Sequence, residues 1–416
     1  MKIEKVPFPE WENRLLTEWG ELLEAASEPS VFLSPEWIIA WQRHFGGDVE
    51  PLLLIARDTS GRLSGLAPLC RRRMRPARLS GPYLLAFLAA EGVGSEYLGV
   101  LARNGSEPEF VRSLARELAG QWALVDLRGL REGSRSAVLI PQAFGSRAPA
   151  RIHRERHPCS ALRLPADYEE FLASLASKFR TTLRYRTNKL VKNFDVKLVK
   201  TVREEELDDQ LARLYEMHQE RWEAEGHSGS FYQPRKRSFY REVSAAFLRR
   251  GWLRFYHLQV DGVIRASQFG FAHRGVLHSL QEAFDYRFRP PGVGGVGVVL
   301  RGMVIRESIA EGLTSYDFLG GDEEFKTRWG TTTHRVQRVR IGASGPAGAL
   351  AFLWAAGGRD ARLWVRAHLP PWMVAARDRW RVRRQARRAR HLEAKLGTRG
   401  GASAKHLEED GGEASG

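Results

Sequence analysis

The chain has 416 residues, of which 43% are hydrophobic and 27% charged, so it is long enough for two domains and too apolar to be disordered throughout. Its two cysteines, Cys70 and Cys159, exclude a disulfide framework and a cysteine-based zinc cluster, so we expect a reducing compartment and no metal. The net charge of +16 favours an anionic partner: a nucleic acid, an anionic membrane or an anionic substrate.

The first 28 residues are charged and lack the apolar segment of a signal peptide. No uninterrupted apolar run in the sequence is long enough to cross a bilayer. We therefore expect a cytoplasmic protein, with peripheral contact at the inner membrane surface as the alternative.

The first half of the chain predicts a mixture of helices and short strands. In chain order the predicted elements are helices over 11–26 and 35–44, a hairpin of strands over 52–57 and 63–71, a strand over 96–101, a helix over 108–119 and a strand over 122–127. The second half repeats this order in outline, which favours two similar domains.

A basic helix is predicted between the halves, over 167–193. Asp167 is a plausible N-cap, and apolar residues recur after it at helical spacing. Arg180 and Arg184 share one face of this helix, among further lysines and arginines. This face predicts binding of a nucleotide phosphate, an anionic acceptor or RNA, with a solvated surface as the plain alternative.

The second half predicts helices, a three-stranded meander and a glycine-rich loop that opens a helix. The elements are helices over 206–225 and 232–249, strands over 252–260, 264–272 and 276–284, the loop over 289–297, a helix over 298–311 and a strand over 315–319. Asp261-Gly262 marks the first hairpin turn. The free N–H groups of a glycine-rich helix start suit a phosphate. The spacing fits neither a Walker loop nor a dinucleotide fingerprint, so a plain tight turn stays open.

Several short motifs together resemble the CelD/BcsL-type acetyltransferases of the GNAT superfamily, and more loosely the FemAB-like aminoacyltransferases. The motifs are Phe32-Leu33-Ser34-Pro35-Glu36-Trp37 with Trp41, the basic run from Lys178 to Arg186, Phe284-Asp285-Tyr286-Arg287, Pro291-Gly292, Tyr316 to Gly321, and Phe325-Lys326-x-x-Trp329-Gly330. The resemblance covers roughly residues 30 to 340. It implies a tandem GNAT α/β (α+β) fold with two mixed, mostly antiparallel sheets, and a role in exopolysaccharide or cellulose biosynthesis.

The resemblance also implies the donor site. An acyl-CoA, such as acetyl-CoA, would lie along the strand 276–284 with its pyrophosphate on the loop that follows. The residues implied to bind it are Gln281, Arg289, Gly292, Val293, Gly294, Gly295 and Val296. Glycines there allow close approach of the backbone.

Acyl transfer needs a base for the acceptor, a group that polarises the carbonyl and an acid for the leaving thiolate. Glu282 and Asp285 are the candidate bases, with a sheet-face salt bridge as the alternative for Glu282 and with His257 and His278 as alternative bases. Lys326 is the candidate polarising group and Tyr286 the candidate acid. Asp317, in a short buried strand, needs a partner, for which Arg328 is one candidate.

The acceptor is the least defined part. Arg180, Arg184, Trp222, Phe231 and Trp329 are the candidate acceptor-binding residues, because arginines bind anions and aromatic rings stack on sugars. Core packing is the alternative for the aromatic residues. A sugar hydroxyl, a sugar amine and a peptide amine all remain as acceptors.

We predict four regions: an N-terminal GNAT-like domain over 1–150 that acts as scaffold and acceptor groove, a C-terminal GNAT domain over 151–345 with the donor site, a basic amphipathic extension over 346–397, and a disordered tail over 398–416. The extension's arginines and tryptophans suit an anionic membrane, although a solvated helix face is the favoured interpretation. The predicted function is acyl-CoA-dependent N- or O-acyl transfer. A tRNA-dependent aminoacyltransferase, with a nucleic acid as partner, and an inactive GNAT scaffold are the alternatives.

Overall fold

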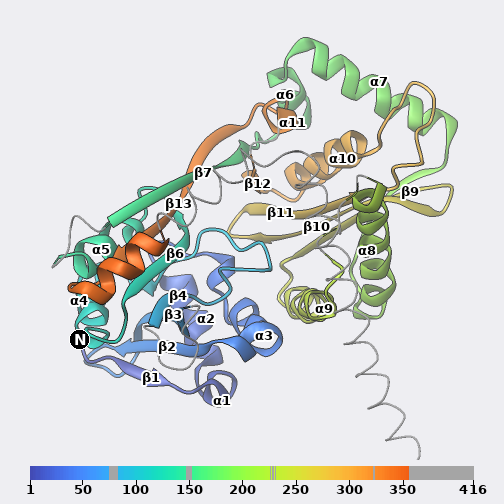
Figure 1. Ribbon diagram of the computed structural model, residues 1–416. Coiled ribbons are helices and arrows are strands. Elements are labelled where there is room, and N and C mark those ends of the chain that lie inside the picture. Colours follow the sequence, from blue (N-terminus) through green and yellow to red (C-terminus); the bar gives the residue numbers. More distant parts are fainter. Residues whose placement is uncertain are drawn as a thin grey trace, which may run out of the picture.

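The computed structural model describes residues 1–74, 83–146, 152–224, 226, 229, 231–321 and 324–355. Its strands are β1 (Glu4–Val6), β2 (Glu50–Arg57), β3 (Leu63–Arg73), β4 (Tyr83–Phe87), β5 (Leu101–Ala102), β6 (Leu124–Arg131), β7 (Ile152–Arg163), β8 (Val196–Lys200), β9 (Leu253–Val260), β10 (Val263–His273), β11 (Val276–Phe284), β12 (Ser315–Gly320) and β13 (Thr332–Gly342). These strands form one 13-stranded sheet with helices on its two faces (Figure 1).

The helices connect the strands in two similar sets. They are α1 (Phe8–Glu10), α2 (Leu16–Ala25), α3 (Pro35–Phe45), α4 (Glu107–Glu117), α5 (Arg135–Phe144), α6 (Tyr168–Ser174), α7 (Ser177–Asn193), α8 (Leu207–Ala224), α9 (Pro234–Arg249), α10 (Gly297–Ala310) and α11 (Glu324–Thr327), and a further helix covers 346–355. In the C-terminal half, α8 and α9 lie on one face of the sheet, and α7 and α10 lie on the other (Figure 1). The two faces bury separate apolar clusters.

The strand order is symmetric about its centre: β1-β2-β3-β4-β6-β13, then β7-β12-β11-β10-β9-β8. Each half contains one parallel pair, β4 with β6 and β11 with β12. The halves exchange their last strands. β7 follows β6 in the chain but pairs with β12, whereas β13 follows β12 but pairs with β6, and β7 and β13 pair with each other.

This exchange corrects the expectation of two sheets. The α/β class is as predicted, but β7 and β13 hydrogen-bond over ten residue pairs from Thr332–Ala161 to Ile341–Ile152 and join the halves into one sheet. β13 lies within the range predicted for the C-terminal domain, yet one of its edges completes the N-terminal half. The halves therefore cannot part without breaking this ladder.

An aromatic cluster also joins the halves. The ring of Trp37 on α3 lies edge-on to Phe239 of α9 at 4.9 Å and to Phe271 of β10 at 5.6 Å, and Phe32 contacts Trp37 and Phe271. All four side chains are buried. The aromatic residues of the N-terminal motif thus hold α3 against the C-terminal half.

Most predicted elements are present, but one predicted strand is wrong and several elements were not predicted, among them β4, α5, β7 and β13. Asp261 and Gly262 adopt φ of +51° and +78°, as a tight hairpin turn requires. The strand predicted over 96–101 is wrong: Tyr97 has φ of +51°, which breaks an extended chain, and the only strand residues there are Leu101 and Ala102. β4 was not predicted, because it is a continuous apolar run without the alternation of a half-buried strand.

Candidate active site

The parallel strands β11 and β12 pair over only three residues and then part. Val276, Leu277 and His278 pair with Ser315, Tyr316 and Asp317, and no further pairing of these strands occurs in the described residues. A bulge in β11 accompanies the separation, since Ser279 lies opposite Gly270 and Gln281 opposite Phe269. Beyond the bulge, the alternation of side chains along β11 is shifted by one residue, so the opposite set of side chains faces α10. The result is a wedge with unpaired backbone along β11.

The glycine-rich loop connects β11 to α10. Inside it, the N–H groups of Val293 and Gly294 both donate to the carbonyl of Pro290, at 3.0 and 3.3 Å. The side chains of Val293 and Val296 are buried and anchor the loop. Two of the predicted phosphate donors are therefore used within the loop. In the described residues no backbone acceptor takes the N–H of Gly295 or Val296.

The start of α10 is also open to a ligand. Its N-cap residue, Val296, supplies no side-chain hydrogen bond to the first turn. An uncapped helix start carries a partial positive charge and unsatisfied N–H groups. Together with Gly295, it forms a concave set of donors that suits a phosphate.

Basic side chains of α7 lie over this loop. A Cβ placed on Gly292 would collide with Nζ of Lys189, and one on Gly294 would lie 3.7 Å from Cζ of Arg186. The predicted basic helix thus lies beside the glycine loop, and the residues that it places over the loop are Arg186 and Lys189. The predicted pair has other partners: Arg180 donates to the carbonyl of Ala173 at 3.0 Å, and Arg184 pairs with Glu169 at 2.5 Å.

The two predicted bases near β11 are both paired. Glu282 faces α10 and forms two hydrogen bonds with the buried guanidinium of Arg301, one of them 3.1 Å from Nε. Asp285 accepts from Arg265 at 2.8 Å and from the N–H groups of Arg287 and Phe288. Burial raises the pKa of Asp285, but these hydrogen bonds outweigh it and leave the pKa lowered. An ionised carboxylate with three donors anchors the loop and is a poor base.

Tyr286 and Arg289 lie on the same loop. Nε of Arg287 donates to the hydroxyl of Tyr286 at 3.1 Å, and Nε of Arg289 donates to the Tyr286 carbonyl at 3.0 Å. Gln281, after the bulge, belongs to the part of β11 that no longer pairs with β12. All three residues lie on β11 or on the loop that follows it, and their roles in binding and catalysis stay predictions.

Lys326 belongs to α11, and its buried side chain reaches the end of β12. Its ammonium donates to the carbonyl of Gly320 at 2.8 Å and lies 3.4 Å from that of Gly321. It therefore fixes the point where β12 leaves the wedge. The side chain is only 4% exposed, which is rare for lysine and implies a specific role.

The predicted acceptor-binding aromatic residues are mainly structural. Trp329 is buried and packs against Phe171 and Phe179. Phe231 is buried against Tyr215. Trp222 donates through Nε1 to Nε2 of His218 at 3.0 Å. Core packing, the alternative stated for these rings, accounts for the first two.

A polar cluster that the sequence did not predict lies where the halves meet. The hydroxyl of Tyr97, from the N-terminal half, donates to Oδ2 of Asp317 at 2.7 Å and lies 2.8 Å from Nε2 of His334. Asp317 also accepts from the N–H of Leu319 and lies 3.6 Å from Nδ1 of His278. Arg328, which the sequence indicated as one candidate partner of Asp317, instead faces Glu324, at 3.7 Å.

Ionisation in this cluster is defined by burial and by its hydrogen bonds. Burial raises the pKa of Asp317, but the nearby His278 and the hydrogen bonds from the Tyr97 hydroxyl and the Leu319 N–H outweigh it and leave the pKa lowered, so the carboxylate is ionised. Burial lowers the pKa of His334, which leaves a neutral imidazole at pH 7. The cluster thus holds a carboxylate, a phenol and a neutral imidazole in contact, an arrangement able to accept and relay a proton.

A cleft of about 730 Å³ opens onto this cluster. Tyr97, His278, Asp317 and His334 contribute to its wall, together with residues from both halves such as Ser134 and Arg274. Its size suits a small polar acceptor.

Three potential metal ligands lie near Lys326. Single atoms of Glu96, His157 and Cys159 are within 4.8 Å of one another. Burial raises the pKa of Cys159 to about 12, so the thiolate that a metal requires is disfavoured. The expectation of a metal-free enzyme stays a prediction.

His257, an alternative base, is buried and bonded to Ser267 at 2.8 Å and Thr201 at 3.1 Å. Burial lowers its pKa from 6.5 to about 4, so between these values the unfolded chain binds a proton that the folded chain does not. We expect stability to fall by on the order of 3 kcal/mol from this residue as the pH drops from about 6.5 to about 4. Urea unfolding at several pH values would measure this.

In the same experiment, His257→Gln should flatten the pH dependence below 6.5. His157→Gln should have the opposite effect, because the hydrogen bond that His157 donates to Glu96 raises the pKa of His157 and stabilises the fold at low pH. An unchanged slope in His257→Gln would show that this histidine does not titrate as its burial implies.

Comparison with known proteins places this site in a defined domain. Residues 177–327 match the family model of an acetyltransferase (GNAT) domain, a range that runs from α7 to α11 and contains the wedge, the glycine loop and Lys326. The acyltransferase class expected from the sequence is confirmed by this match. A comparison with curated proteins found no match.

Solved structures share the fold over most of the chain. A crystal structure of FemX aligns with a TM-score of 0.57 at 11% identity, covering 81% of this chain and 97% of FemX. A protein of unknown function from Bacteroides thetaiotaomicron aligns with a TM-score of 0.52 at 13% identity, covering 82% of this chain and 99% of its own. A tandem GNAT protein from the clavulanic acid pathway aligns more weakly, with a TM-score of 0.43 at 12% identity over 83% and 99%. At these identities the likeness concerns the fold alone.

Proposed function

We propose that this protein transfers an acyl group from an acyl-CoA held at the glycine loop to a hydroxyl or amine in the cleft between the halves. The observation that carries this proposal is the position of the loop. It follows the wedge between β11 and β12, starts an uncapped helix and lies under Lys189 and Arg186. Backbone donors and two cations together suit the phosphates of a CoA carrier.

The thioester would then lie in the wedge, beside the unpaired backbone of β11. N–H groups there would bind the carbonyl oxygen as it gains negative charge. The acceptor atom attacks the carbonyl carbon and loses its proton, the C–S bond breaks, and the CoA thiolate takes up a proton. Tyr286, on the loop after β11, is the proposed donor of that proton.

The acceptor would approach from the cleft of about 730 Å³. His334 is the proposed base, because its imidazole is neutral and its Nε2 is bonded to Tyr97. Asp317 would stabilise the imidazolium through the Tyr97 hydroxyl. Glu282, paired with Arg301, would orient α10 in place of acting as the base.

Calorimetric titration of nuclease-treated protein with acetyl-CoA tests the donor. We expect saturable binding in the micromolar range, which falls as salt concentration rises because phosphate contacts are screened. Turnover with sugar amines, sugar hydroxyls and peptide amines would then identify the acceptor. Binding of a longer acyl-CoA alone would revise the acyl chain, and binding of no acyl-CoA would reject the proposal.

The resemblance supports a role in exopolysaccharide or cellulose biosynthesis, which remains part of the proposal. In the described residues no helix combines the length and the hydropathy needed to cross a membrane. Most of the predicted basic extension and the whole predicted tail lie outside the described residues, so membrane contact stays an expectation.

An aminoacyl-tRNA is the alternative donor, implied by the resemblance to the FemAB-like aminoacyltransferases and compatible with the basic face of α7. A salt-sensitive gel shift with tRNA, together with failure to bind acyl-CoA, would favour this alternative. Failure to bind either donor would leave the inactive scaffold.

A further inference from the structure

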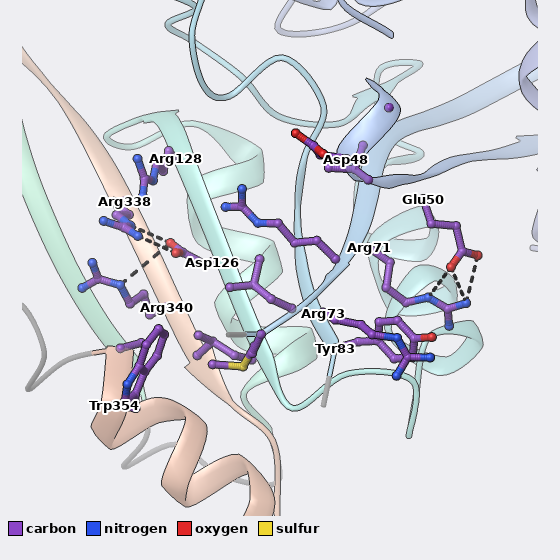
Figure 2. Close-up of a pocket in the computed structure, with 17 residues that line it drawn as sticks. Asp48, Glu50, Arg71, Arg73, Tyr83, Asp126, Arg128, Arg338, Arg340 and Trp354 are labelled. Atoms are coloured by element: carbon purple, nitrogen blue, oxygen red, sulfur yellow. Dashed lines mark hydrogen bonds and ion pairs between the residues drawn. The ribbon is translucent and has the colours of Figure 1, made fainter. Parts of the chain in front are cut away.

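A second basic groove lies in the N-terminal half, apart from the wedge and its loop. It has a volume of about 990 Å³ and is lined by residues of β3, β4, β6 and β13 and by Trp354 (Figure 2). Six arginines line it against three carboxylates, so its wall carries a positive excess. The arginines are Arg71, Arg72, Arg73, Arg128, Arg338 and Arg340.

The groove is not the N-terminal counterpart of the donor wedge. In the C-terminal half the wedge lies at the carboxyl ends of the parallel strands β11 and β12. The groove instead includes Tyr83, Leu84 and Leu124, at the amino ends of the parallel strands β4 and β6. A ligand in the groove would therefore not lie at the place in the N-terminal half that corresponds to the donor site of the C-terminal half.

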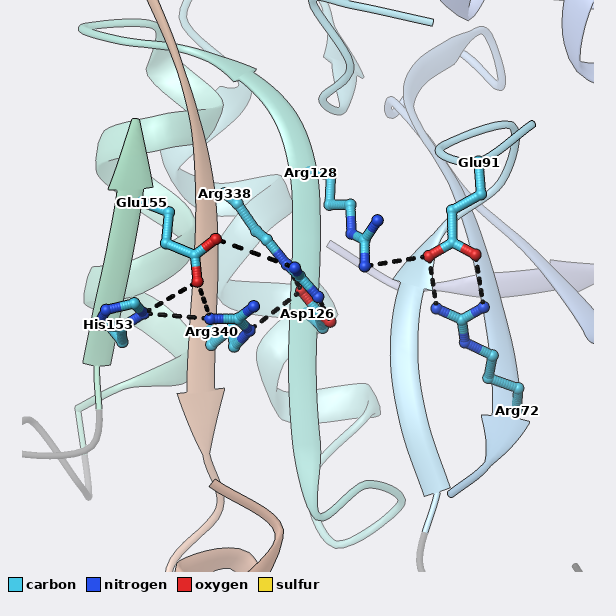
Figure 3. A network of polar contacts seen from close by, with 8 residues as sticks. All are labelled: Arg72, Glu91, Asp126, Arg128, His153, Glu155, Arg338 and Arg340. Carbon is cyan, nitrogen blue, oxygen red and sulfur yellow. Dashed lines mark hydrogen bonds and ion pairs between the residues drawn. The ribbon is translucent and has the colours of Figure 1, made fainter. Parts of the chain in front are cut away.

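Several of these guanidiniums are fixed in place by carboxylates (Figure 3). Arg338 binds Asp126 through Nε at 2.6 Å and Nη2 at 2.5 Å, and Arg340 binds Glu155. Because Arg340 and Asp126 are cross-strand partners, the register of β13 against β6 sets this geometry. Such contacts reduce the entropy that the arginines would lose on binding a ligand.

The carboxylates of the network are shared between cations. Arg72 and Arg128 both face Glu91, each at 3.2 Å, and Asp126 lies between Arg338 and Arg340. A carboxylate shared by two arginines leaves guanidinium N–H groups for a further acceptor, because each guanidinium has five donors. The buried Nε of Arg340 has no hydrogen-bond partner in the described residues and faces Asp126 only at 3.8 Å.

Burial and the neighbouring Arg338 also lower the pKa of Arg128, which indicates crowded positive charge. An anion in the groove would relieve this repulsion. Crowded positive charge favours any anion, so the kind of anion is inferred from the aromatic rings beside the arginines.

Aromatic rings flank the arginines. Arg71 and Arg73 stack on the ring of Tyr83, with Cζ at 4.3 and 4.6 Å from its centre, and Trp354 is half exposed at the groove's edge (Figure 2). Exposed tryptophan beside arginine suits a ligand that joins a phosphate to a flat ring. The volume suits a molecule of nucleotide size.

We propose that this groove binds a phosphorylated ligand of nucleoside-diphosphate class, with its phosphate oxygens on Arg73 and Arg128 and its ring against Trp354. Arginine matches phosphate oxygens with two parallel hydrogen bonds, which favours phosphate over a single carboxylate. The same phosphate chemistry occurs in a free nucleotide and in a lipid headgroup, and the experiment separates these two sources. The groove is independent of the donor site.

Titration of the full chain with uridine diphosphate and with inorganic pyrophosphate is the test. We expect saturable binding of both, tighter for the nucleotide because of its ring, and weaker as salt rises. Arg128→Gln and Arg73→Gln should each weaken binding about tenfold through loss of a charge-assisted hydrogen bond. Arg62→Gln, an exposed arginine paired with Asp58 outside the groove, is the matched control and should bind normally.

Vesicles of phosphatidylcholine with phosphatidic acid test the lipid source. Sedimentation of the wild-type protein with these vesicles, reduced by Arg73→Gln and Arg128→Gln, would assign the groove to a lipid phosphate. Binding that those variants leave unchanged but Gly295→Trp removes would move the ligand to the glycine loop and overturn the proposal. Absence of binding to every probe would overturn it as well. Only the second result leaves the acyl-CoA site untouched, since the first would place the probe on the glycine loop.

Discussion

A tryptophan at position 295 should abolish acyl-CoA binding and leave the fold intact. A Cβ on Gly295 meets no atom within 4 Å, and the residue has no positive φ, so the indole fits without backbone strain. It would then occupy the space in front of the uncapped start of α10. Losing the phosphate contacts there should weaken binding at least about 100-fold. Calorimetry with acetyl-CoA measures this, and thermal unfolding checks the fold.

The neighbouring glycines give less clear tests. Gly294 has φ of +68°, so a tryptophan there would add backbone strain of roughly 1–2 kcal/mol to any effect on binding. At Gly292 the new side chain would displace Lys189. Gly295→Ala is the conservative partner and should bind normally.

Gly47→Trp is the positional control. Gly47 is equally open and lies on the arginine groove, so unchanged acyl-CoA binding in Gly47→Trp would show that the carrier does not use that groove. Wild-type affinity in Gly295→Trp would exclude the glycine loop as the donor site.

Local features of the sequence predicted the turn and the glycine loop of the C-terminal half well. The Asp261-Gly262 turn and the glycine loop depend on residues within a few positions, and both are in place. The basic helix was also predicted, yet the residues over the loop are Arg186 and Lys189. Helical periodicity defines which residues share a face but not which face meets the loop, since that depends on how α7 packs.

Distant contacts could not be predicted. Tyr97 bonds Asp317 across 220 residues, and the only sequence interpretation of its segment was a strand. Nothing in 332–342 indicates that β13 pairs with β6 in preference to β12, because the residues of a strand carry no mark of the strand beside which they will lie. The pairing of Glu282 with Arg301, on the helix that follows β11, could be predicted in kind, since a salt bridge was the stated alternative for Glu282.

The two polar clusters follow from the strand exchange. His334 enters the cleft because β13 crosses beside β7, and Arg338 and Arg340 enter the groove because the same strand continues beside β6. One strand thus contributes to both proposed ligand sites. Val336 and Gln337, which lie between His334 and Arg338 in this strand, are buried, so the strand is held in the core between the two sites.

Lys326→Ala should lower turnover far more than donor affinity. The ammonium holds the carbonyls of Gly320 and Gly321, where β12 leaves the wedge, and lies close enough to Cys159 to influence its ionisation. The buried positive charge would stabilise an oxyanion formed in the wedge, so its loss should reduce kcat about 100-fold or more. The dissociation constant of acetyl-CoA should change by less than about threefold, because the phosphates bind at the loop.

A purely structural role for Lys326 predicts a different pattern. If the lysine only anchors β12, then Lys326→Ala should lower thermal stability and donor affinity together, and Lys326→Arg, which keeps a donor for the carbonyls, should restore both. If it acts on the reaction, Lys326→Arg should restore stability but not full turnover, because a guanidinium spreads over a plane the charge that the ammonium concentrates at one point. Wild-type turnover in Lys326→Ala would remove the residue from the mechanism.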